Sequence, residues 1–489
     1  MTHKLWTAYE AAAATGGMLC SRGGDPNRWE AEEWEAQGLS IDTRSLKPGE
    51  IFVALSDVRD GHDFIEDAFK AGASAALVTR PAVNAPDGKP YLVVRDTMEA
   101  LRDMARAARL RNFGKRVAVT GSAGKTSTKD MLRHMLSVAG EVHAADRSFN
   151  NHFGVPLTLA RMPIDARFGV FEIGMNHAGE ITPLVDLVRP HTVVITTVAA
   201  AHLEFFDSVA DIAEAKAEIL TGLMPGGTAI LPRDNEHYAL LRKRADASCA
   251  GTILTFGSDP AADIRLIEAK QGDDAQHVRF LFDGKEFGFD LGVPGEHQAM
   301  NALAAFAAAC AIGAQAGPCL EALAGFKIGA GRGAQIQVSL PDDKGTITLI
   351  DESYNANPAS MRVAIELLGN AKRSAQNSAH NGGRRIAVLG EMLELGETSA
   401  TLHAGLAGPL ANAGVDLIHL AGKGMAPLWD MTPQAKRGAW CEDMKSAGES
   451  FLAAIIGSLQ DGDQLMVKGS NASGVSKIAD AIRALNENK

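Results

Sequence analysis

A glycine-rich turn lies between an apolar run and an amphipathic helical pattern in VAVTGSAGKTSTKDML, residues 117–132. At the start of a helix, unpaired backbone N–H groups and the helix dipole favour an anion. The two glycines let the backbone approach a phosphate, the lysine adds positive charge, and the next hydroxyl is a typical magnesium ligand. The usual loop has a further Gly where this sequence has Val119, so the loop is shortened. We predict a nucleotide-phosphate site formed by Gly121, Ser122, Ala123, Gly124, Lys125, Thr126 and Ser127.

Three further side chains could act at this site, two at the ends of predicted strands and one on a predicted helix. Glu172 ends the apolar run FGVFE and His202 follows TVVITTV, so both lie at carboxyl ends of strands, where open parallel sheets bind ligands. Lys216 lies on the helical pattern that follows. A phosphate-bound magnesium needs a carboxylate, which Glu172 could supply. Taken singly, each residue has an ordinary alternative: a strand-end acid, a loop histidine with a backbone hydrogen bond, and a solvated helix lysine.

The elements around these residues predict an α/β fold with three domains. Residues 1–112 alternate short apolar runs with helical patterns, for example the strands GEIFVAL and ASAALVTR and the helix DFIEDAFKAG. Residues 113–326 contain RVAVT, FGVFEIG, TVVITTV and GTAILP, continuous apolar runs typical of parallel strands buried on both faces. Helical patterns between these runs predict a central doubly wound sheet. Residues 327–489 contain the strands TITLIDESY, RRIAVLG and DQLMVKGS, each followed by a helical stretch.

The composition predicts a soluble, cytoplasmic protein. A chain of 489 residues is too long for one hydrophobic core, and 46% apolar residues provide ample core. The net charge of −11, with no basic face, argues against a nucleic-acid partner, and no apolar run approaches the roughly 20 residues of a membrane span. The start of the chain has no secretion-signal pattern, and five scattered cysteines without a Cys-x-x-Cys pair suit a reducing compartment.

Together, these motifs and their order resemble the Mur ligase family, the ATP-dependent amide ligases of peptidoglycan assembly. The shortened loop TGSAGKTST is similar to the family's phosphate loop, and NNHFGVPLTL, FEIGMNHAGEI, AHLEFF, AKAEI and PGEHQAMNALAA are similar to other family blocks. The resemblance covers nearly the whole chain. It implies an N-terminal UDP-sugar-binding α/β domain at 1–112, a central P-loop ATPase-like domain at 113–326, and a Rossmann-like ligase domain at 327–489 that closes on the ATP.

The resemblance also implies roles in catalysis and metal binding. Catalytic roles would belong to Lys125, His202, Lys216 and Arg332, the last reaching the ATP from the third domain. Two magnesium ions would be bound by Thr126, Glu172, His202 and Lys216. Lys216 resembles the lysine that this family carbamylates with CO₂, a modification that turns a cation into an anion able to approach a metal. Carbamylation needs a neutral amine, which suits a lysine buried near other cations.

Other positions match the family's substrate contacts. Beyond the phosphate loop, the implied ATP contacts are Asn301, His297, Arg332, Asp351, Tyr354 and Asn355. The implied contacts to the UDP substrate are Ser40, Asp42, Thr43, Arg44, Ser45, Asn150, Asn151, Asn176 and His177. An incoming dipeptide would be bound by Asn355 and Asn357.

Two stretches, IDESYNANPASM and VLGEMLELGE, distinguish members of the family. They are similar to the member that joins D-alanyl-D-alanine to UDP-N-acetylmuramoyl-tripeptide through an acyl phosphate, giving UDP-N-acetylmuramoyl-pentapeptide, ADP and phosphate. The Asp-Asn-Pro-Arg signature of the ligase that adds the third amino acid is absent. The resemblance implies a monomer, and it leaves the third residue of the tripeptide open between diaminopimelate and lysine.

Two alternatives stay open on the sequence alone. The first is another amino-acid ligase of the same family. The second is a phosphate-loop kinase, which would use Lys125, Thr126 and Glu172 but gives no reason for His202 and Lys216 in this order.

Overall fold

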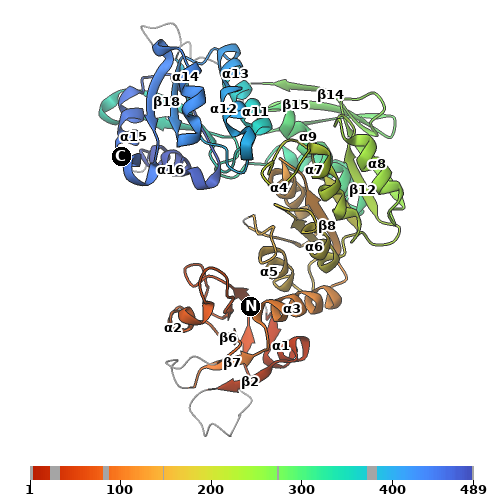
Figure 1. Ribbon diagram of the computed structural model, residues 1–489. Helices are drawn as coiled ribbons and strands as arrows, with labels where there is room; N and C mark the ends of the chain where they lie inside the picture. The colour runs from red at the N-terminus through yellow and green to blue at the C-terminus, as the bar shows by residue number, and fades with distance from the viewer. Residues whose placement is uncertain are drawn as a thin grey trace.

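The computed structural model describes residues 4–21, 33–80, 88–146, 148–272, 275–371 and 383–486, which form three α/β units. Figure 1 shows the first unit at the bottom of the view, the middle unit at the right and the third unit at the upper left. None of the helices within these ranges combines the length and the apolar composition that a membrane crossing requires. Short 3-10 helices lie at Gly61–Phe64, Glu218–Leu220, Pro341–Asp343, Gly396–Thr398, Lys423–Met425, Gln434–Lys436 and Asn471–Ser473.

The first unit contains a sheet with the strand order β2-β7-β6-β5-β4, in which only β2 runs antiparallel to its neighbour. The predicted strands in GEIFVAL and ASAALVTR are β5 and β6, and both are confirmed. A separate antiparallel pair joins β1 and β3. The elements are β1 (Trp6–Thr7), α1 (Ala8–Thr15), β2 (Met18–Ser21), β3 (Glu35–Ala36), β4 (Gly38–Ser40), β5 (Glu50–Val53), α2 (Ile65–Lys70), β6 (Ala75–Val78), β7 (Pro90–Val93) and α3 (Thr97–Arg111).

The middle unit contains a sheet with the order β16-β15-β14-β13-β12-β11-β8-β10-β9. The four predicted strands are β8, β10, β11 and β12, all parallel, and the doubly wound arrangement is confirmed. The elements are β8 (Lys115–Thr120), α4 (Lys125–Ser137), β9 (Val142–Ala144), α5 (Gly154–Ala160), β10 (Phe168–Glu172), α6 (Ile181–Val188), β11 (Thr192–Ile195), α7 (Val209–Ala217), β12 (Thr228–Pro232), α8 (Tyr238–Asp246), β13 (Thr252–Gly257), β14 (Ile264–Gln271), β15 (Gln276–Phe282), β16 (Lys285–Leu291), α9 (Glu296–Ala311) and α10 (Ala316–Leu323).

The position of β8 explains where this sheet binds ligands. β8 pairs with β10 on one side and with β11 on the other, so the chain leaves it in both directions across the sheet. Ligands bind at such a switch point, outside the carboxyl ends of the strands. Along β8, Val117 and Val119 pack into one hydrophobic cluster while Ala118 packs into another, as expected for a strand covered on both faces.

The sequence patterns did not predict the antiparallel extension of the middle sheet. β14 continues parallel to β13, and β15 and β16 then fold back as antiparallel strands. Along the first part of β15, buried residues alternate with exposed or partly buried ones, as expected for a strand with one solvated face. Phe280 of β15 packs against Phe306 of α9, so this extension covers the long Ala-rich helix.

The third unit has the strand order β17-β18-β22-β19-β20-β21, with β17 antiparallel and the other strands parallel. The three predicted strands are β18, β19 and β22, and the Rossmann-like character is confirmed. The elements are β17 (Ala334–Ser339), β18 (Thr346–Glu352), α11 (Pro358–Asn370), β19 (Arg385–Gly390), α12 (Ser399–Ala404), α13 (Ala407–Asn412), β20 (Leu417–Ala421), α14 (Ala426–Met431), β21 (Arg437–Cys441), α15 (Met444–Ser458), β22 (Gln464–Lys468) and α16 (Ser476–Ala484).

The hydrophobic clusters join the first and middle units but not the third. Trp6 and Leu101 belong to the same cluster as Ala118 of β8, and the indole N–H of Trp6 donates to the carbonyl of Ala160 at 2.9 Å. The two clusters of the third unit contain only residues of that unit. Movement of the third unit would therefore break polar contacts without opening a shared apolar core.

Because of a buried histidine in the third unit, we predict that the folded protein loses stability in acid. Burial, with a smaller contribution from Arg384, lowers the pKa of His419 to about 4, and its Nδ1 accepts a hydrogen bond from the N–H of Ala439 at 3.0 Å. Because an unfolded histidine titrates near 6.5, the unfolded chain binds more protons between these values. The contribution of His419 to the free energy of unfolding is complete above about pH 6.5. It is lost as the pH falls toward about 4, at up to ~1.4 kcal/mol per pH unit.

Thermal unfolding of the full chain between pH 7 and pH 4.5 measures this effect. His419→Asn keeps a hydrogen-bond acceptor near the Nδ1 position but cannot titrate, so its stability should depend less steeply on pH than that of the wild type. Equal slopes for the two proteins would contradict the prediction.

Candidate active site

A cavity of about 750 Å³ lies between the middle and third units. On one side it is lined by residues that follow β8, β10, β11 and β12 and by the start of α9. On the other side it is lined by residues that follow β18, β19 and β22. The carboxyl ends of two parallel sheets therefore face the same space, where open α/β sheets bind ligands.

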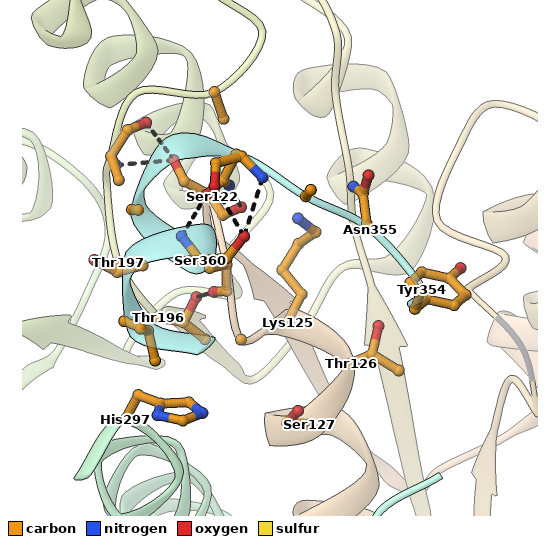
Figure 2. Close-up of a pocket in the computed structure, with 18 of the residues that line it drawn as sticks. Ser122, Lys125, Thr126, Ser127, Thr196, Thr197, His297, Tyr354, Asn355 and Ser360 are labelled. Carbon is orange, nitrogen blue, oxygen red and sulfur yellow. Dashed lines mark hydrogen bonds between the residues drawn. The ribbon is translucent and has the colours of Figure 1, made fainter. Parts of the chain in front are cut away.

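The phosphate loop forms one wall of this cavity. α4 begins at Lys125, directly after Gly124, whose φ of 80° favours glycine. Nζ of Lys125 donates to the carbonyl of Gly121 at 2.7 Å, which curls the side chain over the loop. Figure 2 shows Lys125 between the loop at Ser122 and the residues Tyr354 and Asn355 of the third unit. Burial lowers the pKa of Lys125, against the opposing effect of the Glu172 carboxylate.

The close packing of Gly124 gives a testable prediction. A Cβ at Gly124 would lie 2.3 Å from Oδ1 of Asn301 on α9, and the backbone conformation would be strained. We expect Gly124→Ala to weaken ATP binding about tenfold or more, because an added cost of roughly 1.4 kcal/mol is sufficient for that factor. Titration with a fluorescent ATP analogue measures the affinity.

Gly313→Ala is the matched control, because Gly313 has φ 90° but no atom lies within 4 Å of the position that a Cβ would take there. An equal loss of affinity in both variants would contradict the role of the clash with Asn301.

A hydroxyl and a carboxylate meet beside the loop. Oγ1 of Thr126 donates to Oε2 of Glu172 at 2.5 Å, and the side-chain amide of Asn150 donates to Oε1 of the same carboxylate at 2.7 Å. Glu172 is 3% exposed at the end of β10. The hydroxyl of Ser148 lies 3.1 Å from that of Thr126. Such oxygen donors suit a hard divalent cation.

Two further cationic or basic groups lie close to Lys125. Lys216 on α7 is 1% exposed, and its ammonium makes no hydrogen bond or ion pair within the described residues. Burial, with a smaller contribution from Lys125, lowers the pKa of Lys216 well below its ordinary value. Burial also lowers the pKa of His202, although Glu394 raises it. Both groups are therefore shifted toward their neutral forms.

The third unit contacts the phosphate site through three polar side chains. The Arg332 guanidinium donates to Oγ of Ser148 at 3.0 Å and lies 3.8 Å from the ring centroid of Tyr354. The side-chain amide of Asn357 donates to the carbonyl of Ser122 at 3.2 Å. Glu394 contacts His202, with Oε2 and Nδ1 2.5 Å apart. In this structure the third unit therefore contacts the phosphate loop and the residues around it directly.

Comparison with known proteins shows to which family a chain with this arrangement belongs. Three family models match successive parts of the chain: "Mur ligase family, catalytic domain" at 35–109, "Mur ligase middle domain" at 119–309, and "Mur ligase, glutamate ligase domain" at 339–471. The UDP-N-acetylmuramoyl-tripeptide–D-alanyl-D-alanine ligase of Bacillus subtilis (strain 168) is 36% identical over 80% of this chain and 81% of its own length. The chain belongs to the Mur ligase family. The predicted family is confirmed.

Two further Mur ligases extend the similarity. The ligase of the same name from Escherichia coli (strain K12) is 34% identical over 92% of this chain and 94% of its own length. A crystal structure of MurF from Acinetobacter baumannii superposes with a TM-score of 0.80 and 28% identity, covering 98% of each chain. The predicted three-domain α/β fold is therefore confirmed as that of a Mur ligase.

Most of the predicted site residues of this Mur ligase meet at one cavity. Those that line it are Ser122, Ala123, Gly124, Lys125, Thr126, Ser127, Asn150, Glu172, Asn176, His202, His297, Asn301, Arg332, Tyr354, Asn355 and Asn357. The predicted residues outside this lining are Ser40, Asp42, Thr43, Arg44, Ser45, Gly121, Asn151, His177, Lys216 and Asp351. Gly121 and Lys216 nevertheless belong to the same site, because the carbonyl of Gly121 accepts from Lys125 and the charge of Lys125 helps to lower the pKa of Lys216.

Asp351, predicted as an ATP contact, is fully buried and bonded within the third unit. One carboxylate oxygen accepts from the N–H of Gly331 at 2.9 Å and also contacts Arg483, and the other accepts from the hydroxyl of Ser353 at 2.6 Å. In this structure Asp351 anchors the segment that carries Arg332. Its contact to ATP stays a prediction.

The predicted contacts to the UDP substrate do not all lie together: some line the main cavity, some lie in the first unit, and Asn151 and His177 lie outside both. Asn150 and Asn176 lie at the main cavity. The turn at 40–45 follows β4 in the first unit, where Asp42 and Arg44 form an ion pair at 2.7 Å. The side chain of Asn151 accepts from the N–H of Gly154, the first residue of α5, at 2.9 Å, and the ring of His177 packs on Phe205 with centroids 4.4 Å apart. Binding to these residues stays a prediction.

Several residues of the cavity were not predicted from the sequence. Ser148 connects Arg332 with Thr126, and Lys468 donates to the carbonyl of Asn355 at 3.0 Å. Glu394 lies in the stretch VLGEMLELGE, whose pattern gives none of its residues a role. Their position at the end of a parallel strand could have indicated these residues in the sequence. Glu394 lies just beyond the end of β19, and Lys468 ends β22.

Proposed function

We propose that this Mur ligase joins D-alanyl-D-alanine to UDP-N-acetylmuramoyl-tripeptide with ATP, giving UDP-N-acetylmuramoyl-pentapeptide, ADP and phosphate. The relatives from Bacillus subtilis and Escherichia coli carry the name of this ligase, at 36% and 34% identity. The cavity has a phosphate loop on one side and residues of the third domain on the other, as a reaction between ATP and two further substrates requires.

The observation that carries this proposal is the environment of Lys216. A buried lysine without a hydrogen bond or ion pair among the described residues is costly, and its lowered pKa favours the neutral amine. A neutral amine is the form that reacts with CO₂ to give a carbamate. We propose that Lys216 is carbamylated, which would replace a cation next to Lys125 by an anion. A kinase offers no reason for such a lysine.

The residues present fit magnesium. Thr126 and Glu172 supply oxygen donors, and His202 lies at the same cavity. Within the described ranges, no group of three or more His, Cys, Asp and Glu side chains could hold a metal. The remaining ligands would therefore be phosphate oxygens and water, as is usual for magnesium. When bound, magnesium would reduce the negative charge on the phosphates of ATP.

We propose that catalysis begins when the terminal carboxylate of the tripeptide attacks the γ-phosphorus of ATP. The bond from the γ-phosphorus to ADP breaks and an acyl phosphate forms. Because two anions approach each other, positive charge must offset their repulsion. Lys125 would neutralise the phosphates from the middle domain and Arg332 from the third, and both line the cavity.

In the second step, the amine of D-alanyl-D-alanine attacks the acyl carbon after losing a proton, and phosphate leaves the tetrahedral intermediate. Asn355 would border the dipeptide. Asn357 already donates to the Ser122 carbonyl and caps α11 by accepting from the N–H of Ser360 at 2.8 Å. To bind the dipeptide, the side chain of Asn357 would have to exchange these hydrogen bonds for hydrogen bonds to the dipeptide.

We propose three domains with the boundaries 1–112, 113–326 and 327–489. Residue 112 lies between α3 and β8, and residue 326 lies between α10 and β17. A hinge at 327–332 would let the third domain open for substrate entry, since its hydrophobic clusters are its own. Closure would exclude water from the acyl phosphate.

Phosphate release from ATP by the purified protein tests the proposal. The assay contains magnesium and UDP-N-acetylmuramoyl-tripeptide, with diaminopimelate or lysine as its third residue, with or without D-alanyl-D-alanine. Release that needs both substrates, with a pentapeptide product of matching mass, is expected. Activity with a free amino acid in place of the dipeptide would indicate another ligase of the family. No release with any amine would contradict the ligase function.

A further inference from the structure

Glu394 of the third unit contacts His202 of the middle unit directly. Oε2 of Glu394 lies 2.5 Å from Nδ1 of His202, and the carbonyl of Glu394 accepts a hydrogen bond from the N–H of Glu204 at 3.1 Å. The side chain and the backbone of one residue thus both hold the loop that carries His202. This loop supplies a proposed metal ligand, so the third unit reaches the metal site itself.

The loop that carries Glu394 is held by buried groups of its own unit. The N–H of Met392 donates to Nε2 of His403 at 2.9 Å, and the N–H of Leu393 donates to Oγ of Ser470 at 3.0 Å. His403 is fully buried, and its Nδ1 lies 2.8 Å from the carbonyl of Ser399, which fixes the tautomer that accepts at Nε2. Glu394 therefore extends from an anchored loop.

The backbone at both ends of this contact is strained. Among the described residues, five that are not glycine have positive φ, and His202 at 58° and Glu394 at 61° are two of them. Such conformations are unfavourable for residues with a side chain and persist only where the surroundings impose them. Two strained residues in contact across a domain boundary indicate a specific interaction between the two loops.

The geometry leaves one ring nitrogen of His202 for a ligand. When Nδ1–H donates to the Glu394 carboxylate, the lone pair is on Nε2, and no hydrogen bond within the described residues occupies that atom. Histidines that bind metals nearly always donate the other N–H to a carboxylate, carbonyl or water, which fixes the tautomer and the ring orientation. Here the carboxylate comes from a different domain.

We infer that Glu394 is a positioning residue that orients the metal-binding His202 only when the third domain is closed on the middle domain. This inference rests on the metal role of His202 in the proposed function. Metal binding and domain closure then favour each other by the same factor, because coupling between two equilibria is reciprocal. The magnesium complex of ATP would thereby promote the closure that excludes water from the acyl phosphate.

Manganese binding tests the inference without turnover. Electron paramagnetic resonance measures Mn²⁺ affinity in the full-length protein with an ATP analogue that cannot transfer its γ-phosphate. Glu394→Ala is expected to weaken one Mn²⁺ site about 10- to 100-fold, as loss of such a partner does in other metal sites. Glu394→Gln should lose much less Mn²⁺ affinity, because its amide oxygen can still accept a hydrogen bond from Nδ1–H of His202.

Glu397→Gln is the matched control, because Glu397 is exposed in the same loop region and makes no hydrogen bond or ion pair with the described residues. It should bind Mn²⁺ like the wild type. The double variant His202→Ala/Glu394→Ala should bind no more weakly than His202→Ala alone, because Glu394 acts through the imidazole. Small-angle scattering should show that the analogue and Mn²⁺ close the wild type more fully than Glu394→Ala.

The outcomes separate this inference from the proposed function. Equal Mn²⁺ affinity in Glu394→Ala and the wild type would overturn the inference and leave the metal role of His202 intact. A further loss of Mn²⁺ affinity when Glu394→Ala is added to His202→Ala would also overturn the inference. If His202→Ala itself left both Mn²⁺ sites unchanged, the metal role of His202 would fail, and the inference with it.

Discussion

Replacing Arg332 by Ala is expected to lower the rate of phosphate release by about 10³-fold or more, the effect that arginines have in phosphoryl transfer. Arg332 lines the cavity from the third domain, and it is held between Oγ of Ser148 and the ring of Tyr354. Its charge would meet the γ-phosphate only in the closed form. The loss should therefore fall mainly on kcat, while the affinity for ATP changes much less.

Two further variants make this test more specific. Arg332→Lys keeps a positive charge but loses the planar fork that donates to Ser148 and stacks on Tyr354, so an intermediate rate is expected. Arg362→Ala removes an exposed arginine from α11 of the same domain and should leave the rate unchanged. A loss below tenfold for Arg332→Ala, measured with saturating substrates, would contradict the assigned role.

Replacing Lys216 by Arg is expected to lower the ligation rate by about 10³-fold, within the range for removal of one preorganised electrostatic group. Lys216 is buried beside Lys125 and His202, and its lowered pKa favours the neutral amine that CO₂ requires. Arginine stays protonated and cannot form the carbamate. The variant would put a permanent cation where the proposed function needs an anion.

The carbamate can be observed independently of activity. With ¹³C-labelled bicarbonate, the wild type should give a carbamate carbon signal by NMR that Lys216→Arg lacks. Lys243→Arg, on the exposed side of α8, is the control for a change of lysine to arginine in the same domain. Retention of more than about a tenth of the rate in Lys216→Arg would exclude an essential carbamate.

The sequence by itself determined the phosphate loop and its neighbours. Gly121 to Ser127 are consecutive, and a strand, a glycine-rich turn and a helix start fix their arrangement through local backbone geometry. Glu172 and His202 were predictable because carboxyl ends of parallel strands meet at one edge of a sheet. Continuous apolar runs identified those strands, since both faces of the sheet are buried.

The family resemblance implied roles for Arg332 and Asn357, but only the tertiary structure decided which atoms of the middle domain the third domain contacts. Arg332 meets Ser148 across 184 residues, Glu394 meets His202 across 192, and Asn357 meets Ser122 across 235. Periodicity and turn signals describe neighbours in sequence, whereas these contacts depend on how two separately packed cores dock. Asp351 is the opposite case: the family resemblance implied an ATP contact, but Arg483 and the segment at Gly331 bond its carboxylate inside the domain. A buried carboxylate must be paired, and only the complete packing determines by which partner.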